Sequence, residues 1–293
     1  MVDLEAIRKA NFRVVIDCVN SVGGVVLPQL LNALGVKEVV ELYCTPNGQF
    51  PHNPEPLPEH LTEIASCMKM EKADVGFVVD PDVDRLAIIC ENGAMFGEEY
   101  TLVSVSDYVL THTPGNTVSN LSSTRALSDV TNAHGGTYTA AAVGEVNVVT
   151  TMKAVKAVIG GEGNGGVIYP ECHYGRDALV GIALFLSHLA HSGKTVSELR
   201  ATYPAYYMDK QKIELTPQMD DDAIDAILAA VKRRFSKEKV NDIDGVKIDF
   251  PDKWVHLRKS NTEKIIRIYA EAQTKAEAEE LSSQIREVIA SLI

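Results

Sequence analysis

The sequence predicts an α/β fold: two consecutive α/β domains with mixed sheets, followed by a smaller α+β domain with an antiparallel sheet. Over the first two thirds of the chain, short apolar strand segments alternate with helical segments, the pattern of α/β domains. The last third instead combines a helix, several short strands and a second helix. Breaks in this pattern follow His112 and lie near Pro204. We therefore expect domains at 1–112, 113–205 and 206–293.

The first domain opens with apolar segments typical of buried strands. We expect its strands at 12–19, 39–43, 74–79 and 86–90. A helix is expected over 25–34, ended by Gly35, because glycine adopts the left-handed backbone of a helix C-cap. A second helix, 59–70, follows a proline-rich loop. Strands and helices therefore alternate through this segment.

The second domain repeats the alternation and the third departs from it. In the second domain we expect strands at 117–122 and 154–159 and helices at 126–133 and 177–190. The third domain begins with an amphipathic helix that Asp220 or Asp221 caps. Its strands are expected at 245–250, 254–259 and 265–270. Thr274 and Glu277 form the signature of a capping box for the final helix.

Composition excludes several classes of protein. The formal net charge of −12 argues against a nucleic-acid partner, and no apolar run approaches the roughly 20 residues of a membrane span. The five cysteines are widely spaced and form no C-x-x-C pair, so we expect reduced thiols in a cytoplasmic protein. In so acidic a chain, an anionic substrate needs a local cluster of basic residues.

The first loop whose residues suggest a chemical function is 80–85 (DPDVDR), which lies between two apolar strands. Its three carboxylates, Asp80, Asp82 and Asp84, repel one another, and each pKa rises unless a cation neutralises them. Hard divalent cations prefer such oxygen ligands. Three ligands from one loop leave coordination positions open for a phosphate. A solvated acidic turn is the alternative reading of the same spacing.

The second loop is 161–166 (GEGNGG). It contains a formal G-x-G-x-x-G, but a strand follows where dinucleotide binding requires a helix. Glycines allow backbone to approach a ligand closely, and Glu162 with Asn164 would accept and donate hydrogen bonds to sugar hydroxyls. A flexible hairpin is the alternative. His173 and Arg176 follow the loop and are further candidates for contact with sugar or phosphate.

The third loop is 258–264 (RKSNTEK), with Arg267 just beyond it. Cationic, hydroxyl and amide groups meet here in a turn between two strands. Arginine forms paired hydrogen bonds with phosphate oxygens, and loop N–H groups add more. The segment therefore suits a phosphate, and an exposed polar hairpin is the alternative.

In this order, the three loops resemble those of the α-D-phosphohexomutase family, which includes phosphoglucomutase, phosphomannomutase and phosphoglucosamine mutase. The resemblance covers nearly the whole chain. It implies the fold described above and an isomerase that interconverts hexose 6-phosphate and hexose 1-phosphate through a bisphosphate. The implied roles are Mg²⁺ binding by Asp80, Asp82 and Asp84, substrate binding by Glu162, Asn164, His173 and Arg176, and phosphate binding by Arg258, Ser260, Asn261, Thr262 and Arg267. Arg85 is the catalytic candidate, either steadying the transferring phosphoryl group or pairing with Asp84.

Departures from the family pattern refine this expectation. Asn164 replaces a serine, a form similar to that of phosphoglucosamine mutases, which we therefore expect as the activity. Glu145 stands where glucose and mannose enzymes often carry histidine, and Lys264 replaces a proline of the phosphate loop. The family's phosphoserine loop, Ser-His-Asn-Pro, is echoed at 51–54 (PHNP) without its serine, and we expect a structural role for this segment.

The chain is therefore expected to correspond to the family's second, third and fourth domains, with an N-terminal phosphoserine domain as its missing partner and a hexose phosphate as its substrate. Alone, it is expected to be inactive. A non-catalytic sugar-phosphate binder that kept the cleft is one alternative. A metal-dependent sugar phosphatase is another, although no Asp-x-Asp-x-Thr motif supports it.

Overall fold

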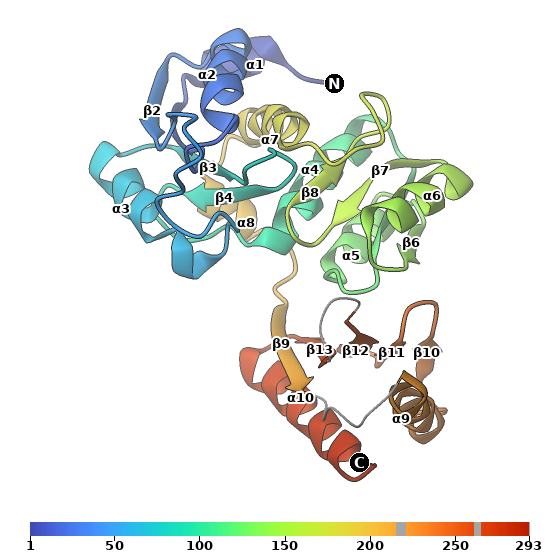
Figure 1. Cartoon of the computed structure of the whole chain (residues 1–293). Helices are drawn as coiled ribbons and strands as arrows, with labels where there is room; N and C mark the ends of the chain where they lie inside the picture. Colours follow the sequence, from blue (N-terminus) through green and yellow to red (C-terminus); the bar gives the residue numbers. More distant parts are fainter. Residues whose placement is uncertain (215–220, 261–264, 293) are drawn as a thin grey trace. The chain divides into compact units, whose positions relative to one another are not determined.

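The computed structural model describes residues 1–214, 221–260 and 265–292. They form two compact units, the first comprising Met1–Ala140 and Gly144–Pro204 and the second comprising Ala141–Val143 and Ala205–Ile293. The predicted fold class is confirmed, with two mixed sheets in the first two thirds of the chain and an antiparallel sheet in the last third (Figure 1). Among the helices that the structure describes, none combines the length and apolar character that a membrane crossing requires.

The first sheet has the strand order β2-β1-β3-β4. Its strands are β1 (Arg13–Asp17), β2 (Glu38–Leu42), β3 (Val75–Val79) and β4 (Leu86–Cys90). The associated helices are α1 (Leu4–Ala10), α2 (Gly23–Leu34), the short 3-10 helix η1 (Pro58–His60) and α3 (Thr62–Glu71). Strand β1 runs parallel to β2 and β3, whereas β4 is antiparallel to β3. Every residue of β3 and β4 is buried, which explains their continuous apolar sequence.

The second sheet has the order β6-β5-β7-β8. It comprises β5 (Asn116–Asn120), β6 (Tyr138–Ala141), β7 (Ala157–Glu162) and β8 (Gly166–Ile168), with helices α5 (Ala126–Ala133) and α6 (Glu145–Val155). Strands β5 and β7 are parallel, and β8 returns antiparallel to β7. A strand therefore follows the glycine-rich loop, as expected, and the dinucleotide-binding reading is excluded.

Two buried helices join these sheets into one unit. Helices α4 (Glu98–His112) and α7 (Ala178–Ser192) each contact β4 of the first sheet and β8 of the second, and the short α8 (Val196–Arg200) contacts β4 (Figure 1). The ring of Phe185 on α7 makes edge contacts with Phe77 and Phe96. Because the two segments share this core, they form one compact unit. The expected domain boundary between residues 112 and 113 therefore stays a prediction.

The second unit is a sheet covered by two helices. Its strands are β9 (Tyr207–Glu214), β10 (Lys239–Asn241), β11 (Val246–Asp249), β12 (Trp254–Lys259) and β13 (Ile265–Ala272), in the order β10-β11-β12-β13-β9, and its helices are α9 (Asp221–Arg234) and α10 (Lys275–Ala290). All neighbouring strands are antiparallel. Apolar side chains of both helices share one core with the strands, including Val231 of α9 and Ile285 of α10.

Some local expectations were wrong. Helix α4 was not predicted, because ten of its residues are buried and it lacks the one-sided apolar stripe that marks a surface helix. The strand expected from residue 154 begins at Ala157, after Lys156 ends α6 in a left-handed conformation. Asp221 is the first residue of α9 rather than its cap, and Asp220 lies outside the described residues.

The capping box of α10 is present. The Thr274 hydroxyl accepts a hydrogen bond from the Glu277 N–H, and the Glu277 carboxylate accepts one from the Thr274 N–H. Thr274→Ala is therefore expected to destabilise the second unit by about 1 kcal/mol. Unfolding followed by the fluorescence of Trp254, the single tryptophan, measures this change. Ser283→Ala, at an exposed site within the same helix, is the control, and an equal loss in both variants would contradict the cap assignment.

Candidate functional site

The aspartate loop connects β3 to β4 in the first unit. The two strands pair up to Val79 opposite Leu86, so the six residues between them form a tight connection. Asp80, Asp82 and Asp84 each present a carboxylate oxygen, and these atoms lie within 4.8 Å of one another. Asp80 is buried, Asp82 exposed and Asp84 half-buried. The loop therefore brings together the three predicted metal ligands.

The electrostatics of this loop suit a cation. Burial, together with the nearby Asp84 and Asp82 carboxylates, raises the pKa of Asp80 to about 7, against the effect of a hydrogen bond from the Arg85 N–H. Its Oδ1 accepts bonds from the N–H groups of Asp84 and Arg85, both at 3.0 Å. Carboxylates held this close together repel one another, so their pKa values rise unless a cation offsets their charge. The oxygen-only donor set fits a hard divalent ion such as Mg²⁺.

Arg85 lies against the same carboxylates. Its Nε is 3.7 Å from Asp80 Oδ2 and 3.8 Å from Asp84 Oδ1, and its Nη1 is 3.3 Å from Glu55 Oε1. Arg85 therefore pairs with Asp84, but only at long range. This pairing is one of the two roles considered for Arg85. The Arg85 side chain is about one-third exposed. Its catalytic role stays a prediction.

The sugar loop is the turn of the β7–β8 hairpin. Glu162 is the last residue of β7 and is buried, and its Oε1 accepts hydrogen bonds from Asn120 Nδ2 at 2.9 Å and from the Gly144 N–H at 3.2 Å. Asn164 Oδ1 accepts a bond from the Gly166 N–H at 3.2 Å, within the turn. Glu162 is thus held rigidly by its neighbours, whereas Asn164 shapes the hairpin.

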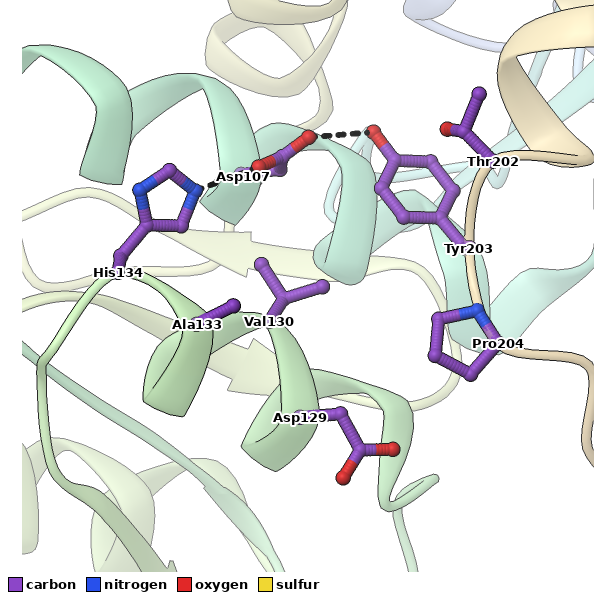
Figure 2. Close-up of a pocket in the computed structure, with 8 residues that line it drawn as sticks. All are labelled: Asp107, Asp129, Val130, Ala133, His134, Thr202, Tyr203 and Pro204. Carbon is purple, nitrogen blue, oxygen red and sulfur yellow. Dashed lines mark hydrogen bonds and ion pairs between the residues drawn. The ribbon is translucent and has the colours of Figure 1, made fainter.

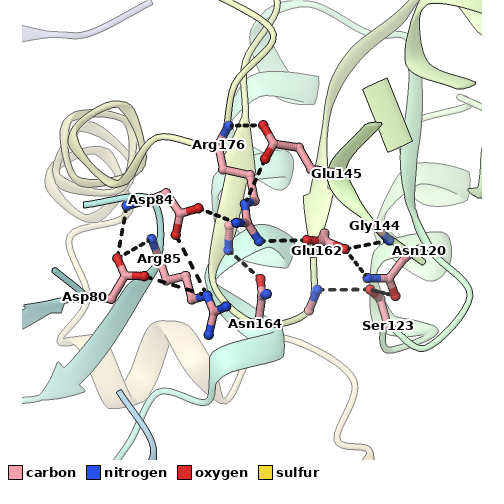
Figure 3. A network of polar contacts seen from close by, with 12 residues as sticks. Asp80, Asp84, Arg85, Asn120, Ser123, Gly144, Glu145, Glu162, Asn164 and Arg176 are labelled. Atoms are coloured by element: carbon pink, nitrogen blue, oxygen red, sulfur yellow. Dashed lines mark hydrogen bonds and ion pairs between the residues drawn. The ribbon is translucent and has the colours of Figure 1, made fainter. Parts of the chain in front are cut away.

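The aspartate loop and the sugar loop are in direct contact. The N–H of Leu86 donates to the carbonyl of Gly165 at 3.1 Å. Arg176 bridges the loops through its guanidinium, which pairs with Asp84 and, through Nη1 at 2.8 Å, with Glu162 (Figure 3). The structure therefore joins two loops that are some 80 residues apart in sequence.

The glycines of the sugar loop are required by this packing. Gly165 has φ +87°, and a Cβ there would lie 2.3 Å from the Leu86 carbonyl oxygen. A Cβ at Gly163 would lie 2.0 Å from a carboxylate oxygen of Glu99. We expected the glycines to let the backbone of the loop approach a ligand closely. At Gly163 and Gly165 the backbone instead lies close to other parts of the protein itself.

The remaining candidates of the first unit lie beyond β8. The exposed His173 ring has its Nε2 2.8 Å from Asp177 Oδ2, and its Nδ1 accepts a bond from the Gly175 N–H. Asp177 also caps α7, with its Oδ1 accepting from the N–H of Leu179 at 2.7 Å. These contacts connect His173 to the start of α7, and its role toward substrate stays a prediction.

In the second unit, Arg258 and Arg267 are directly opposite each other on β12 and β13. Such pairs share one face of the sheet, and like charges there repel unless an anion or a carboxylate offsets them. Arg258 Nε is 3.5 Å from Asp244 Oδ2. Ser260 is buried at the end of β12, and its N–H donates to the Ile265 carbonyl. Asn261, Thr262 and Lys264 lie outside the described residues.

Some polar residues of this network were missed as site candidates. Glu145, noted only as a departure from the family pattern, accepts a bond from the Arg176 N–H at 3.2 Å, and its Oε2 is 3.5 Å from Arg176 Nε. Asn120 links Glu162 to Ser123, whose hydroxyl accepts from the Gly163 N–H (Figure 3). The position of Asn120 at the end of strand β5 was the available signal, since polar side chains there meet at one sheet edge.

His52 of the proline-rich loop is anchored on the first sheet. Its Nε2 is 3.0 Å from the carboxylate of Asp17, a buried residue at the end of β1, and its ring packs edge-on against Tyr43. Burial raises the pKa of Asp17, and the N–H of Val19 and the His52 ring oppose that rise. These contacts anchor the 51–54 segment on the first sheet, and its structural role stays a prediction.

A cavity of about 340 Å³ lies elsewhere in the first unit. Its lining residues are Asp107, Asp129, Val130, Ala133, His134, Thr202, Tyr203 and Pro204 (Figure 2). Asp107 pairs with His134 Nε2 at 2.7 Å and accepts from the Tyr203 hydroxyl at 3.1 Å. Burial alone would raise the pKa of Asp107, but hydrogen bonds from His188 and His134 hold it at about 2. This network ties α4 to α5 and to the residues after α8.

Models of one protein family match the chain in three consecutive segments. Phosphoglucomutase/phosphomannomutase alpha/beta/alpha domain II matches residues 1–93, alpha/beta/alpha domain III matches 97–206, and the C-terminal domain matches 211–288. The chain therefore belongs to the phosphoglucomutase/phosphomannomutase family, as its three loops predicted.

Curated relatives support this assignment. A phosphoglucomutase/phosphomannomutase of Thermococcus kodakarensis is 38% identical over 95% of this chain and 61% of its own length. A probable phosphoglucosamine mutase of Methanopyrus kandleri is 31% identical over 95% of this chain and 62% of its own length. The chain thus spans about three fifths of the curated relatives it matches.

Solved structures share the fold. A phosphoglucomutase/phosphomannomutase family protein from Burkholderia thailandensis superposes with a TM-score of 0.84 at 27% identity, covering 99% of this chain and 63% of that one. An Aspergillus fumigatus N-acetylphosphoglucosamine mutase, solved in complex with GlcNAc-6P and magnesium, superposes with a TM-score of 0.66 at 16% identity over 99% of this chain and 64% of that one. The fold is therefore that of the phosphohexomutases.

Proposed function

We propose that this chain supplies the metal-, sugar- and phosphate-binding parts of a phosphohexomutase that interconverts hexose 6-phosphate and hexose 1-phosphate through a bisphosphate. The observation that carries the proposal is the joined network of the first unit, in which three clustered aspartates adjoin the loop of Glu162. We propose glucosamine phosphate as the substrate, because the sugar loop carries Asn164 in place of a serine. A phosphoserine-bearing domain outside these 293 residues is the proposed phosphoryl donor.

Each group has a role in this proposal. Asp80, Asp82 and Asp84 would hold Mg²⁺, which when bound stabilises the negative charge on a transferring phosphoryl group. Glu162, fixed by its neighbours, accepts hydrogen bonds from sugar hydroxyls. Arg85, whose side chain is partly exposed, would donate to phosphoryl oxygens beside the aspartates.

The phosphate that does not react is assigned to the second unit. The facing pair of Arg258 and Arg267 presents two guanidinium groups on one sheet face, and the buried Ser260 directly follows β12. Charge-assisted hydrogen bonds from such groups contribute about 1.5–3 kcal/mol each.

Arg258→Gln is expected to weaken glucose 6-phosphate binding by the chain about tenfold, because the variant loses the charge of one phosphate-binding group. Isothermal calorimetry measures the change. Arg286→Gln, an exposed charge-matched substitution on α10, is expected to leave affinity unchanged. Equal affinity in the wild type and Arg258→Gln would count against the phosphate assignment.

The activity itself is tested by adding the chain to a separately expressed phosphoserine domain and supplying glucosamine, glucose or mannose 6-phosphate. We expect hexose 1-phosphate only when both parts are present, and fastest turnover with glucosamine 6-phosphate. Turnover by the chain alone would refute the need for the second part. Release of inorganic phosphate as the main product would instead establish a phosphatase.

A further inference from the structure

Arg176 lies among three carboxylates that come from three different segments. Nη2 pairs with Asp84 of the aspartate loop, Nη1 is 2.8 Å from Glu162 of the sugar loop, and Nε is 3.5 Å from Glu145 of α6. The arginine side chain is only 15% exposed. Its guanidinium is therefore committed to the protein's own acidic groups.

The backbone around Arg176 is fixed as well. Its own N–H donates to Glu145 Oε1 at 3.2 Å. The next residue, Asp177, donates its N–H to Val167 of β8 at 2.8 Å, and Ala178 donates its N–H to Val83 of the aspartate loop at 3.0 Å. The guanidinium thus projects from a segment that is hydrogen-bonded to the aspartate loop and to β8, so it holds a defined position.

Arg176 engages one oxygen of each functional carboxylate, and the other oxygen contacts different groups. On Asp84 the partner is Oδ2, while Oδ1 lies 3.8 Å from Arg85 Nε. On Glu162 the partner is Oε2, while Oε1 accepts from Asn120 and Gly144. Groups that hold a ligand carboxylate from behind set its orientation, and their loss typically costs 10–100-fold in metal affinity.

We propose that Arg176 is a positioning residue that couples the cation site to the sugar loop, holding Asp84 for the metal and Glu162 for the sugar through one guanidinium. The inference rests on the proposed function. The planar arginine fork spans two carboxylates at once, whereas a lysine ammonium is a single point charge on a flexible stem. Charge alone therefore does not replace it.

The test measures Mg²⁺ binding to the intact 293-residue chain by calorimetry, without substrate. Arg176→Lys is expected to weaken Mg²⁺ binding at least tenfold, although it keeps the positive charge. Arg200→Lys is the matched control, since Arg200 belongs to the same unit, donates to the Phe96 carbonyl and stacks on Tyr100. Its Mg²⁺ affinity is expected to equal that of the wild type.

A double-mutant cycle separates positioning from general destabilisation. Glu162→Gln is expected to weaken Mg²⁺ binding several-fold in the wild-type background, although Glu162 lies outside the aspartate loop, and to add little once Arg176 is lysine. Fully additive losses would overturn the coupling. Should Arg176→Lys fail to fold, Glu162→Gln alone still tests the link, and unchanged Mg²⁺ affinity in that variant would overturn it.

Two results separate this inference from the proposed function. If Asp82→Asn loses Mg²⁺ binding while Arg176→Lys retains it, the coupling role is wrong and the metal site stands. If the wild-type chain binds no Mg²⁺, the coupling role of Arg176 and the proposed metal site are both wrong. A Mg²⁺ dissociation constant that rises in Arg176→Lys but not in Arg200→Lys supports the inference.

Discussion

Asp82→Asn is expected to weaken Mg²⁺ binding to the chain about 100-fold, or about 2.7 kcal/mol. The variant replaces one of three clustered carboxylates by a neutral amide, which removes both a ligand charge and part of the field that attracts the cation. Calorimetric titration of the wild type and the variant with Mg²⁺ measures the difference.

Asp82 is the informative member of the triplet because it is exposed. Asp80 is buried and accepts two backbone hydrogen bonds, so its replacement would also disturb the loop. Asp84 is paired with Arg176. A change at Asp82 therefore reports on the cation and little else.

The control for Asp82→Asn is Glu59→Gln, which removes one exposed carboxylate from the short helix η1 of the same unit. It is expected to leave Mg²⁺ affinity within about twofold of the wild type, because an exposed carboxylate outside the aspartate loop is well solvated and its charge is screened by salt. Similar losses in both variants would point to general electrostatics, and no loss in Asp82→Asn would remove the metal assignment.

Much of the fold was predictable because its signals are local. The apolar runs that became β3 and β4 are buried on both faces, and Gly35 ends α2 in the left-handed conformation expected of it. The hairpin nature of the sugar loop followed from the strand after it. Helix α4 escaped prediction because burial on all sides removes the periodicity on which helix recognition depends.

The candidate site was predictable in its parts and not in its connections. The aspartate triplet lies within five residues, so sequence alone places those carboxylates together. The pairing of Arg176 with Asp84 joins residues 92 positions apart and depends on how α7 packs beside both loops. Glu145 reaches the same guanidinium from another helix. No local pattern encodes such contacts, because tertiary packing creates them.

Gly165→Ala is expected to destabilise the first unit by about 2–5 kcal/mol. The residue has φ +87°, a conformation that costs an L-residue about 1–2 kcal/mol. The added Cβ would also lie 2.3 Å from the Leu86 carbonyl oxygen, and relieving such a backbone overlap typically costs about 1–3 kcal/mol more. The Leu86 N–H to Gly165 carbonyl bond joins the two loops, so Mg²⁺ affinity is expected to fall with stability.

Gly193→Ala isolates the conformational part of the Gly165→Ala effect. Gly193 also has positive φ, at +62°, but no atom lies within 4 Å of a Cβ built there. Its expected cost is therefore only about 1–2 kcal/mol, with Mg²⁺ affinity unchanged. Because Trp254 belongs to the second unit, hydrogen exchange resolved by peptide is the suitable measure for the first unit. Equal destabilisation by the two alanines would mean that the close packing of the sugar loop on Leu86 contributes nothing to stability. The two loops would then be held together by Arg176 and their flanking strands instead.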